Sequence, residues 1–192
     1  MARKIMLVQG HPDASETHYC HAIENAYVDG AREAGHEVRV IRIAELQFPL
    51  LRSAAEFSGE LPPALSESAE ALKWADHLVL IYPLWLGTMP ALVKAWLEQV
   101  FRPGVALEQT EGWPRRMLKN KSCRVVVTMG MPAFAYRWYF RAHSLKSLER
   151  NVLKFAGIRP VREALIGMVA APNPRGRERW LEKVGELGRR AV

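Results

Sequence analysis

Three segments of the chain contain uninterrupted runs of apolar residues: Lys4–Gln9, Leu78–Ile81 and Val125–Val127. A continuous apolar run is typical of a strand that is covered on both faces, as in the centre of a parallel sheet. Two further candidate strands, His36–Ile43 and Pro160–Ile166, are interrupted by charged residues. This mixture favours positions at the two edges of the sheet.

Segments with apolar residues at helical spacing separate these strands. The stripe of the first one consists of Tyr19, Ile23, Ala26, Tyr27, Gly30, Ala31 and Ala34. The other predicted helices are Ser66–Ala75, Pro90–Phe101, His143–Ala156 and Arg177–Arg190. Ser66 is expected to cap its helix, Pro90 to lie in a first turn, and Gly157 to end the fourth helix.

Five strands therefore alternate with five helices. With the second and fifth strands at the edges, the strand order is 2-1-3-4-5. This predicts an α/β fold, a flavodoxin-like doubly wound five-stranded parallel sheet with helices on both faces. The segments Leu46–Pro63 and Arg102–Lys121 are interpreted as long loops, not linkers. We expect residues 1–192 to form a single domain.

Composition agrees with an ordinary globular domain, because 49% of the 192 residues are hydrophobic and 24% are charged. No apolar run approaches the ~20 residues that span a bilayer. The chain enters an apolar strand without a signal-like region, and Cys20 and Cys123 do not suggest a disulfide framework. We expect a cytoplasmic protein.

The net charge of +7 is compatible with an anionic partner. The basic residues are nevertheless spread along the chain, and no basic helix or known motif organises them for specific nucleic-acid binding. A solvated basic face, or attraction of a cofactor that carries phosphate, is the preferred interpretation.

Ligands of such a sheet bind beyond the carboxyl ends of its strands, where the strand order reverses. The first loop at this edge is Gly10–His18, which precedes a helix. A helix N-terminus offers unpaired N–H groups to phosphate, and Ser15, Thr17 and His11 add further donors. The alternative is an ordinary helix cap with an incidental histidine.

The second loop, Pro83–Met89, places a proline, a tryptophan and a glycine between a strand and a helix. Its backbone N–H groups could address the polar edge of a planar ligand, with Trp85 and Leu86 against the face. Alternatively, Trp85 is a core side chain that packs on the following helix.

The third loop, Thr128–Phe140, is unusually rich in aromatic residues. Such a cluster is a lid, a subunit contact or the apolar start of a helix.

Together these residues match a known family. The chain resembles the flavodoxin-like NAD(P)H:quinone oxidoreductases, which include DT-diaphorase-type enzymes, bacterial quinone reductases and ancillary subunits of Kef potassium efflux systems. The resemblance spans about Ile5 to Arg162. Its motifs are Gly10-His11-Pro12 with Ser15, Tyr82–Trp85 through Met89–Ala91, and Thr128 and Gly130 with Tyr136.

The resemblance implies positions around a flavin, either FMN or FAD. The phosphate end would be surrounded by His11, Ser15, Thr17 and His18. The flavin ring would be lined by Pro83, Leu84, Trp85, Leu86 and Gly87, with Thr128, Met129, Gly130 and Met131 on its other side. Tyr136 falls where the family keeps a tyrosine near the reactive ring. The family histidine six residues further on corresponds to Ala142, and His143, one residue later, is the candidate catalytic partner.

The implied reaction is hydride transfer from NAD(P)H to the flavin, followed by two-electron reduction of a quinone-like acceptor. No metal is expected, whereas the protein is expected to form a homodimer. The alternatives are a regulatory subunit on a potassium efflux transporter, an azo-dye or free-flavin reductase of the same fold, and an electron-carrying flavodoxin. Carriers of the last kind are usually acidic, whereas this chain is basic.

Overall fold

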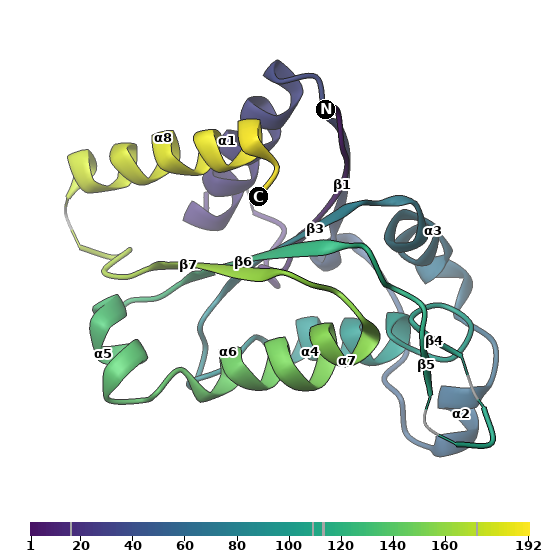
Figure 1. Cartoon of the computed structure of the whole chain (residues 1–192). Helices are drawn as coiled ribbons and strands as arrows, with labels where there is room; N and C mark the ends of the chain where they lie inside the picture. The colour runs from purple at the N-terminus through teal and green to yellow at the C-terminus, as the bar shows by residue number, and fades with distance from the viewer. Residues whose placement is uncertain (16, 109, 113, 172) are drawn as a thin grey trace.

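The computed structural model describes residues 1–15, 17–108, 110–112, 114–171 and 173–192. Within these ranges the chain forms a five-stranded parallel sheet with the order β2-β1-β3-β6-β7 (Figure 1). The strands are β1 (Lys4–Gln9), β2 (Glu37–Arg42), β3 (His77–Pro83), β6 (Ser122–Thr128) and β7 (Val161–Ile166). Since β6 and β7 are the fourth and fifth of these along the chain, the predicted order 2-1-3-4-5 is confirmed.

Burial along the strands explains this order. Every residue of β3 is buried, and β1 is buried from Ile5 onward. The outer strand β2 instead has exposed residues at alternate positions, and β7 has exposed residues in its first half. Charged side chains therefore lie where an edge strand exposes them to water.

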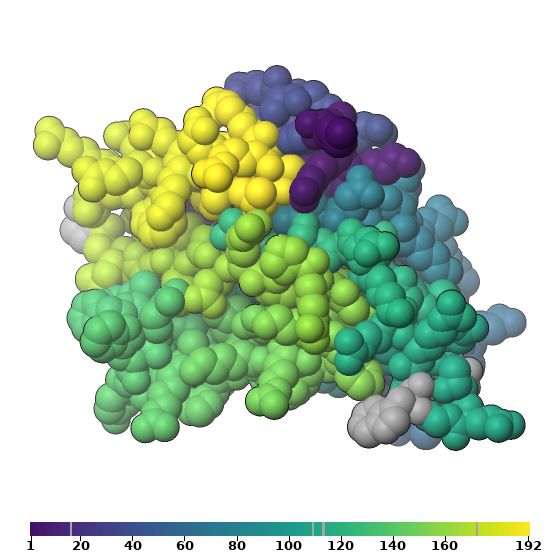
Figure 2. Space-filling model, in the orientation of Figure 1, coloured from purple at the N-terminus to yellow at the C-terminus, as the bar shows by residue number. Residues whose placement is uncertain are grey.

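Helices cover both faces of the sheet (Figure 1). On one face, α1 (Tyr19–Glu33) and α8 (Pro174–Arg190) share a buried apolar cluster with the sheet. The helices of the other face are α3 (Ser66–Trp74), α4 (Ala91–Val100), α6 (His143–Ser147), the π-helical turn η3 (Leu148–Leu153) and α7 (Lys154–Ala156). In Figure 2, α8 (yellow) lies on the upper side and the segment after β6 (green) at the lower left.

Glycines allow α1 and α8 to pack with their backbones in close approach. A Cβ added to Gly30 would lie 2.1 Å from the carbonyl oxygen of Gly185, and one added to Gly188 would lie 2.2 Å from that of Tyr27. Real Cβ atoms do not approach so closely, because packed interiors leave no room for the overlap. The C-terminal helix is therefore held against α1 by backbone contact.

Several details differ from the sequence predictions. Ser66 is the first residue of α3 and not its cap: Leu65, the end of the 3₁₀ turn η2 (Pro63–Leu65), precedes it. Pro90 is the N-cap of α4, one residue before the helix. The two predicted loops also contain short elements, namely α2 (Ala54–Ser58), β4 (Leu107–Glu108) and β5 (Arg115–Arg116), and the 3₁₀ turn η1 (Ile43–Glu45) lies just before the first of these loops.

The fourth predicted helix ends as expected, with Gly157 at a φ of 107°. Among the described residues, no helix has both the length and the apolar character needed to cross a bilayer.

Candidate functional site

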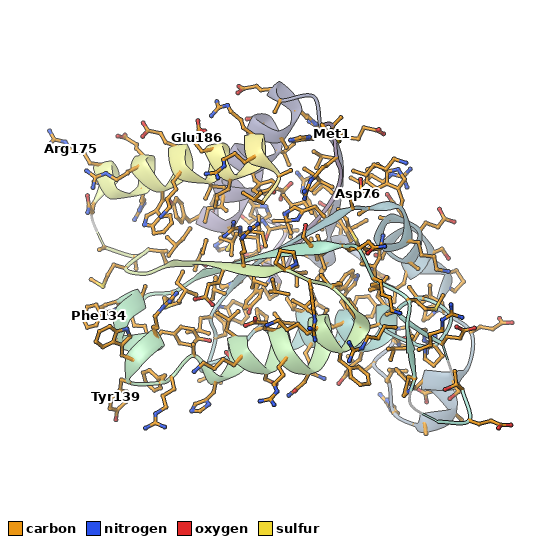
Figure 3. All side chains as sticks on the ribbon, viewed as in Figure 1. Met1, Asp76, Phe134, Tyr139, Arg175 and Glu186 are labelled. Atoms are coloured by element: carbon orange, nitrogen blue, oxygen red, sulfur yellow. The ribbon has the colours of Figure 1, made fainter. Side chains whose placement is uncertain are left out.

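Three loops meet at the carboxyl edge of the sheet, as the strand order requires. The N–H of Gly10 donates to the carbonyl of Ile81 at 2.7 Å, and the N–H of Leu84 donates to that of Thr128 at 2.7 Å. These bonds join the ends of β1, β3 and β6. Figure 3 shows Phe134 and Tyr139, which follow β6, at the opposite side of the molecule from Asp76, which precedes β3.

The first loop gathers histidines around one carboxylate. The rings of His11 and His18 stack with centroids 3.8 Å apart, and Nε2 of His18 lies 2.7 Å from Oδ2 of Asp13. The N–H of Ser15 donates to Oδ1 of the same carboxylate at 2.9 Å. The hydrogen bonds from His18 and Ser15 hold the pKa of Asp13 below its usual range. The loop is therefore ordered by an ionised aspartate.

His11 differs from His18 in being buried. Burial lowers the pKa of His11, and the neighbouring rings of His18 and His21 add to that effect. The two hydroxyl oxygens of Ser15 and Thr17 lie 3.0 Å apart on the exposed side of the loop. All four predicted polar residues of the phosphate end are thus together just before α1.

A buried polar network supports this loop from behind. Gln9 accepts from the N–H of His11 at 3.0 Å and donates to the Glu24 carboxylate at 3.2 Å. The side chain of Glu24 is only 2% exposed and accepts from Arg42 Nε and Nη2 at 3.1 and 2.8 Å. The loop is therefore tied through Gln9 to a buried ion pair.

The second loop contains a tight hairpin turn. The N–H of Trp85 donates to the carbonyl of Thr88 at 2.8 Å, and the N–H of Thr88 donates to the carbonyl of Trp85 at 3.0 Å. Leu86 and Gly87 between them have φ of 47° and 80°, the signature of a type I′ turn. Glycine adopts this conformation freely, whereas Leu86 is strained by it. Such strain is typical of functional sites.

Trp85 is not a core residue, so the alternative interpretation of the second loop is wrong. Its side chain is 48% exposed, and its ring packs edge-on against His11 at 5.8 Å. Leu86 is fully exposed, whereas Pro83 is buried. The turn therefore exposes an indole and a leucine side chain at the carboxyl edge of the sheet, next to the first loop.

The third loop begins deeper in the fold. Thr128 and Met129 are buried, and the Thr128 hydroxyl lies 3.3 Å from the Cys20 sulfur. Burial raises the pKa of Cys20 to about 11, so this thiol is protonated at neutral pH. Gly130 is exposed and Met131 is half-buried. Only the end of this predicted wall therefore faces outward.

The aromatic segment forms the short helix α5 (Ala133–Trp138). Tyr136 is the exception in it, being only 2% exposed. Its hydroxyl lies 2.7 Å from Oγ of Ser144 and accepts the N–H of Leu145 at 3.3 Å. His143 is exposed. The aromatic side chains that remain at the surface are Phe134, Trp138, Tyr139 and Phe140.

A cavity of about 640 Å³ lies between the second loop and the helix that begins at α6. The structure places Trp85 and Leu86 in its wall, but not His143. The lining residues are Trp85, Leu86, Thr88, Met89, Pro90, Ala91, Lys94, Ser144, Ser147, Leu148 and Val152. Most of these are apolar, which suits a flat ring with a few polar atoms.

Three contributors were not foreseen from the sequence: Asp13, Ser144 and the Glu24–Arg42 pair. A signal existed only for Glu24, which interrupts the apolar stripe of the first helix. Across the part of the chain that the structure describes, no group of three histidine, cysteine or acidic side chains could hold a metal ion.

Comparisons with known proteins agree with this architecture. The model of a family described as having a flavodoxin-like fold matches residues 3–187. The "Uncharacterized NAD(P)H oxidoreductase" of Haemophilus influenzae is 25% identical over 182 residues, which are 92% of this chain and 90% of that protein.

Two further similarities concern a shorter alignment and a solved structure. The "FMN-dependent NADH:quinone oxidoreductase 1" of Hahella chejuensis is 37% identical over 100 residues, about half of each protein (51% and 47%). The solved NAD(P)H:quinone oxidoreductase from Methanothermobacter marburgensis superposes with a TM-score of 0.85 at 23% identity, covering 100% of both chains. This structural likeness supports the fold.

Proposed function

The chain belongs to the family with a flavodoxin-like fold that matches residues 3–187, and on this premise we propose that it is a flavin-dependent NAD(P)H:quinone oxidoreductase. The observation that carries the proposal is the meeting of two unlike surfaces at one sheet edge. A helix N-terminus with hydroxyl and imidazole groups lies beside an exposed indole turn. These are the surfaces that the phosphate and the ring of a flavin require.

The residues before α1 fit a phosphate. His18 is the N-cap of this 15-residue helix, and its side chain makes no capping hydrogen bond. The N–H of His21 in the first turn donates to the His18 carbonyl at 2.9 Å, and a helix N-terminus attracts anions through its dipole. The hydroxyls of Ser15 and Thr17 add donors on the exposed side. His18 would exchange its bond with Asp13 for one with the phosphate.

The second and third loops fit a flat ring. The two hydrogen bonds of the turn use the N–H groups of Trp85 and Thr88, so those of Leu86 and Gly87 would donate to the ligand. Trp85 adds apolar surface beside them. The outward-facing backbone at Gly130 supplies the other wall. We propose that the outward-facing members of the predicted ring-lining set contact the ring. The buried members, Pro83, Thr128 and Met129, would support them from behind, since the Thr128 carbonyl and the Met129 N–H already bond within the fold.

A bound flavin supplies the redox chemistry, by accepting a hydride from NAD(P)H and passing two electrons to the acceptor. The chain itself has three tasks. The first loop fixes the phosphate end, the second loop holds the ring against Trp85, and the cavity beside Trp85 excludes water and orients the second substrate. The substrate pair is supported by the NAD(P)H and quinone activities named for the relatives above.

Titration with FMN, FAD and riboflavin tests this proposal. One flavin per chain is expected to bind, to lose fluorescence and to raise the melting temperature, since a ligand of the folded state stabilises it. Riboflavin lacks the phosphate and should bind more weakly. Replacing Ser15 and Thr17 together by alanine should weaken FMN binding by about tenfold while leaving riboflavin binding unchanged. If none of the three flavins binds, the proposal is wrong.

We further propose that the protein is a homodimer. The exposed aromatic side chains Phe134, Trp138, Tyr139 and Phe140 lie on one short segment, and such a patch exceeds what a small monomer usually exposes. Light scattering of the flavin-saturated protein at micromolar concentration should give twice the chain mass of 21.8 kDa. Trp138→Lys should shift the mass toward one chain. A wild-type mass of one chain would contradict the dimer.

A further inference from the structure

The direction of the hydrogen bond between Tyr136 and Ser144 can be assigned from a third group. The backbone N–H of Leu145 can only donate, and it donates to the Tyr136 phenol at 3.3 Å. The phenol proton then needs an acceptor, because buried hydroxyl groups are normally paired. Among the described residues, Ser144 Oγ at 2.7 Å is the acceptor that the phenol can reach. Tyr136 therefore donates to Ser144.

This assignment leaves the proton of Ser144 free for another partner. Ser144 is half-buried and lines the cavity beside Trp85. Two other polar residues of the cavity wall are already bonded, since Ser147 accepts from Asn151 at 3.3 Å and Lys94 is paired with Glu98. The hydroxyl of Ser144 is thus a donor that faces a largely apolar space.

The backbone between α5 and α6 makes this arrangement possible. Arg141 and Ala142 have positive φ values of 53° and 49°, a conformation that costs about 1–2 kcal/mol per residue for side chains other than glycine. The turn brings Ser144 back to the tyrosine eight residues earlier. Strain of this kind persists only where the surrounding structure enforces it.

We propose that Ser144 is the hydrogen-bond donor that binds a carbonyl oxygen of the quinone-like acceptor, and that Tyr136 is a positioning residue that orients the Ser144 hydroxyl. This inference rests on the function proposed above. It replaces the direct contact of Tyr136 with the acceptor that the resemblance implied. It also gives the polar role at this site to Ser144 instead of His143, which does not line the cavity.

The chemical role follows from where charge develops. A quinone that receives a hydride takes up two electrons and one proton, and negative charge accumulates on a carbonyl oxygen before solvent supplies the second proton. A donor already aimed at that oxygen stabilises the charge as it forms. The chain from the Leu145 amide through the phenol to the Ser144 hydroxyl polarises each bond in turn, which strengthens the last donor. No proton leaves Ser144 in this scheme.

Binding of two matched probes to the oxidised, FMN-saturated protein tests the contact. The probes are 1,4-naphthoquinone, which has carbonyl oxygens, and naphthalene, which has the same fused rings without them. Ser144→Ala should weaken naphthoquinone binding by about fivefold, the value of one ordinary hydrogen bond, and leave naphthalene binding unchanged. Ser147→Ala removes a hydroxyl from the same cavity wall, and the ratio of the two dissociation constants should not change. Calorimetry measures both constants.

A double-mutant cycle tests the positioning role of Tyr136. Tyr136→Phe should weaken naphthoquinone binding by about two- to fivefold relative to naphthalene, because the serine hydroxyl loses its orientation. Combined with Ser144→Ala it should cause no further change in that ratio. A merely structural role would lower the melting temperature and affect both probes alike.

The possible outcomes separate the two proposals. If FMN does not bind the wild type, the proposed function fails. If FMN and naphthoquinone bind but the probe ratio is the same in Ser144→Ala as in wild type, the serine contact is overturned while the function stands. If the effects of Tyr136→Phe and Ser144→Ala add, Tyr136 does not act through Ser144.

Discussion

Replacing Arg42 with methionine is expected to lower the free energy of unfolding by about 3 kcal/mol. The Glu24 carboxylate is buried, and Arg42 donates to it through Nε and Nη2 at 3.1 and 2.8 Å. Without the guanidinium, the carboxylate keeps among the described residues the Gln9 donor at 3.2 Å and the more distant His21 Nδ1 at 3.7 Å. An uncompensated buried charge is costly. Because Arg42 is itself partly exposed, the expected loss lies at the lower end of the range for broken buried pairs.

Two further variants make this expectation specific. Arg189→Met breaks an exposed ion pair with Glu33 at 2.7 Å, and the loss of stability should be much smaller, because water screens exposed charges. Adding Glu24→Gln to Arg42→Met removes the orphaned charge and should recover most of the stability. Urea unfolding of the flavin-free protein measures all of them. Equal losses for Arg42→Met and Arg189→Met would show that the buried pair has no special weight.

The sheet could be predicted from the sequence because its signal is local. Apolar runs such as Leu78–Ile81 mark central strands by themselves, and the charges within His36–Ile43 and Pro160–Ile166 mark the edges. Strand order then follows from these two classes without knowledge of any contact. The loops that meet at the carboxyl edge follow from the order. This explains why the general location of the candidate site could be predicted from the sequence.

The polar contacts of the site could not be predicted from the sequence, because they depend on the geometry of the folded chain. Asp13 holds both His18 and the Ser15 amide, yet nothing in a single sequence separates this aspartate from a solvated one. Ser144 reaches Tyr136 only because Arg141 and Ala142 adopt left-handed conformations. Neither residue is a glycine, so the sequence contains no turn signal there. The cap of α3 is a further example: Ser66 was predicted to be the N-cap, but the 3₁₀ turn η2 places Leu65 in that position.

Trp85→Ala is expected to weaken FMN binding by about 5- to 150-fold, which corresponds to about 1–3 kcal/mol of lost apolar contact. The indole is half exposed at the rim of the cavity, and it has space on one side for a ring to pack against it. In the flavin-free protein it makes an edge-on contact with His11 and no deep packing. Its removal should therefore change the free energy of unfolding of that form by less than about 1 kcal/mol.

A second tryptophan in the chain provides the opposite control. Trp74 is the last residue of α3, at the amino edge of the sheet, and it packs against the core. The guanidinium carbon of Arg39 lies 4.3 Å from the centroid of its ring. Trp74→Ala should lower the free energy of unfolding by at least about 2 kcal/mol and leave the FMN dissociation constant unchanged. Fluorescence titration and urea unfolding of both variants give the four numbers needed. If Trp85→Ala destabilises the flavin-free fold as Trp74→Ala does and binds FMN normally, the indole turn is a structural element and the flavin ring lies elsewhere.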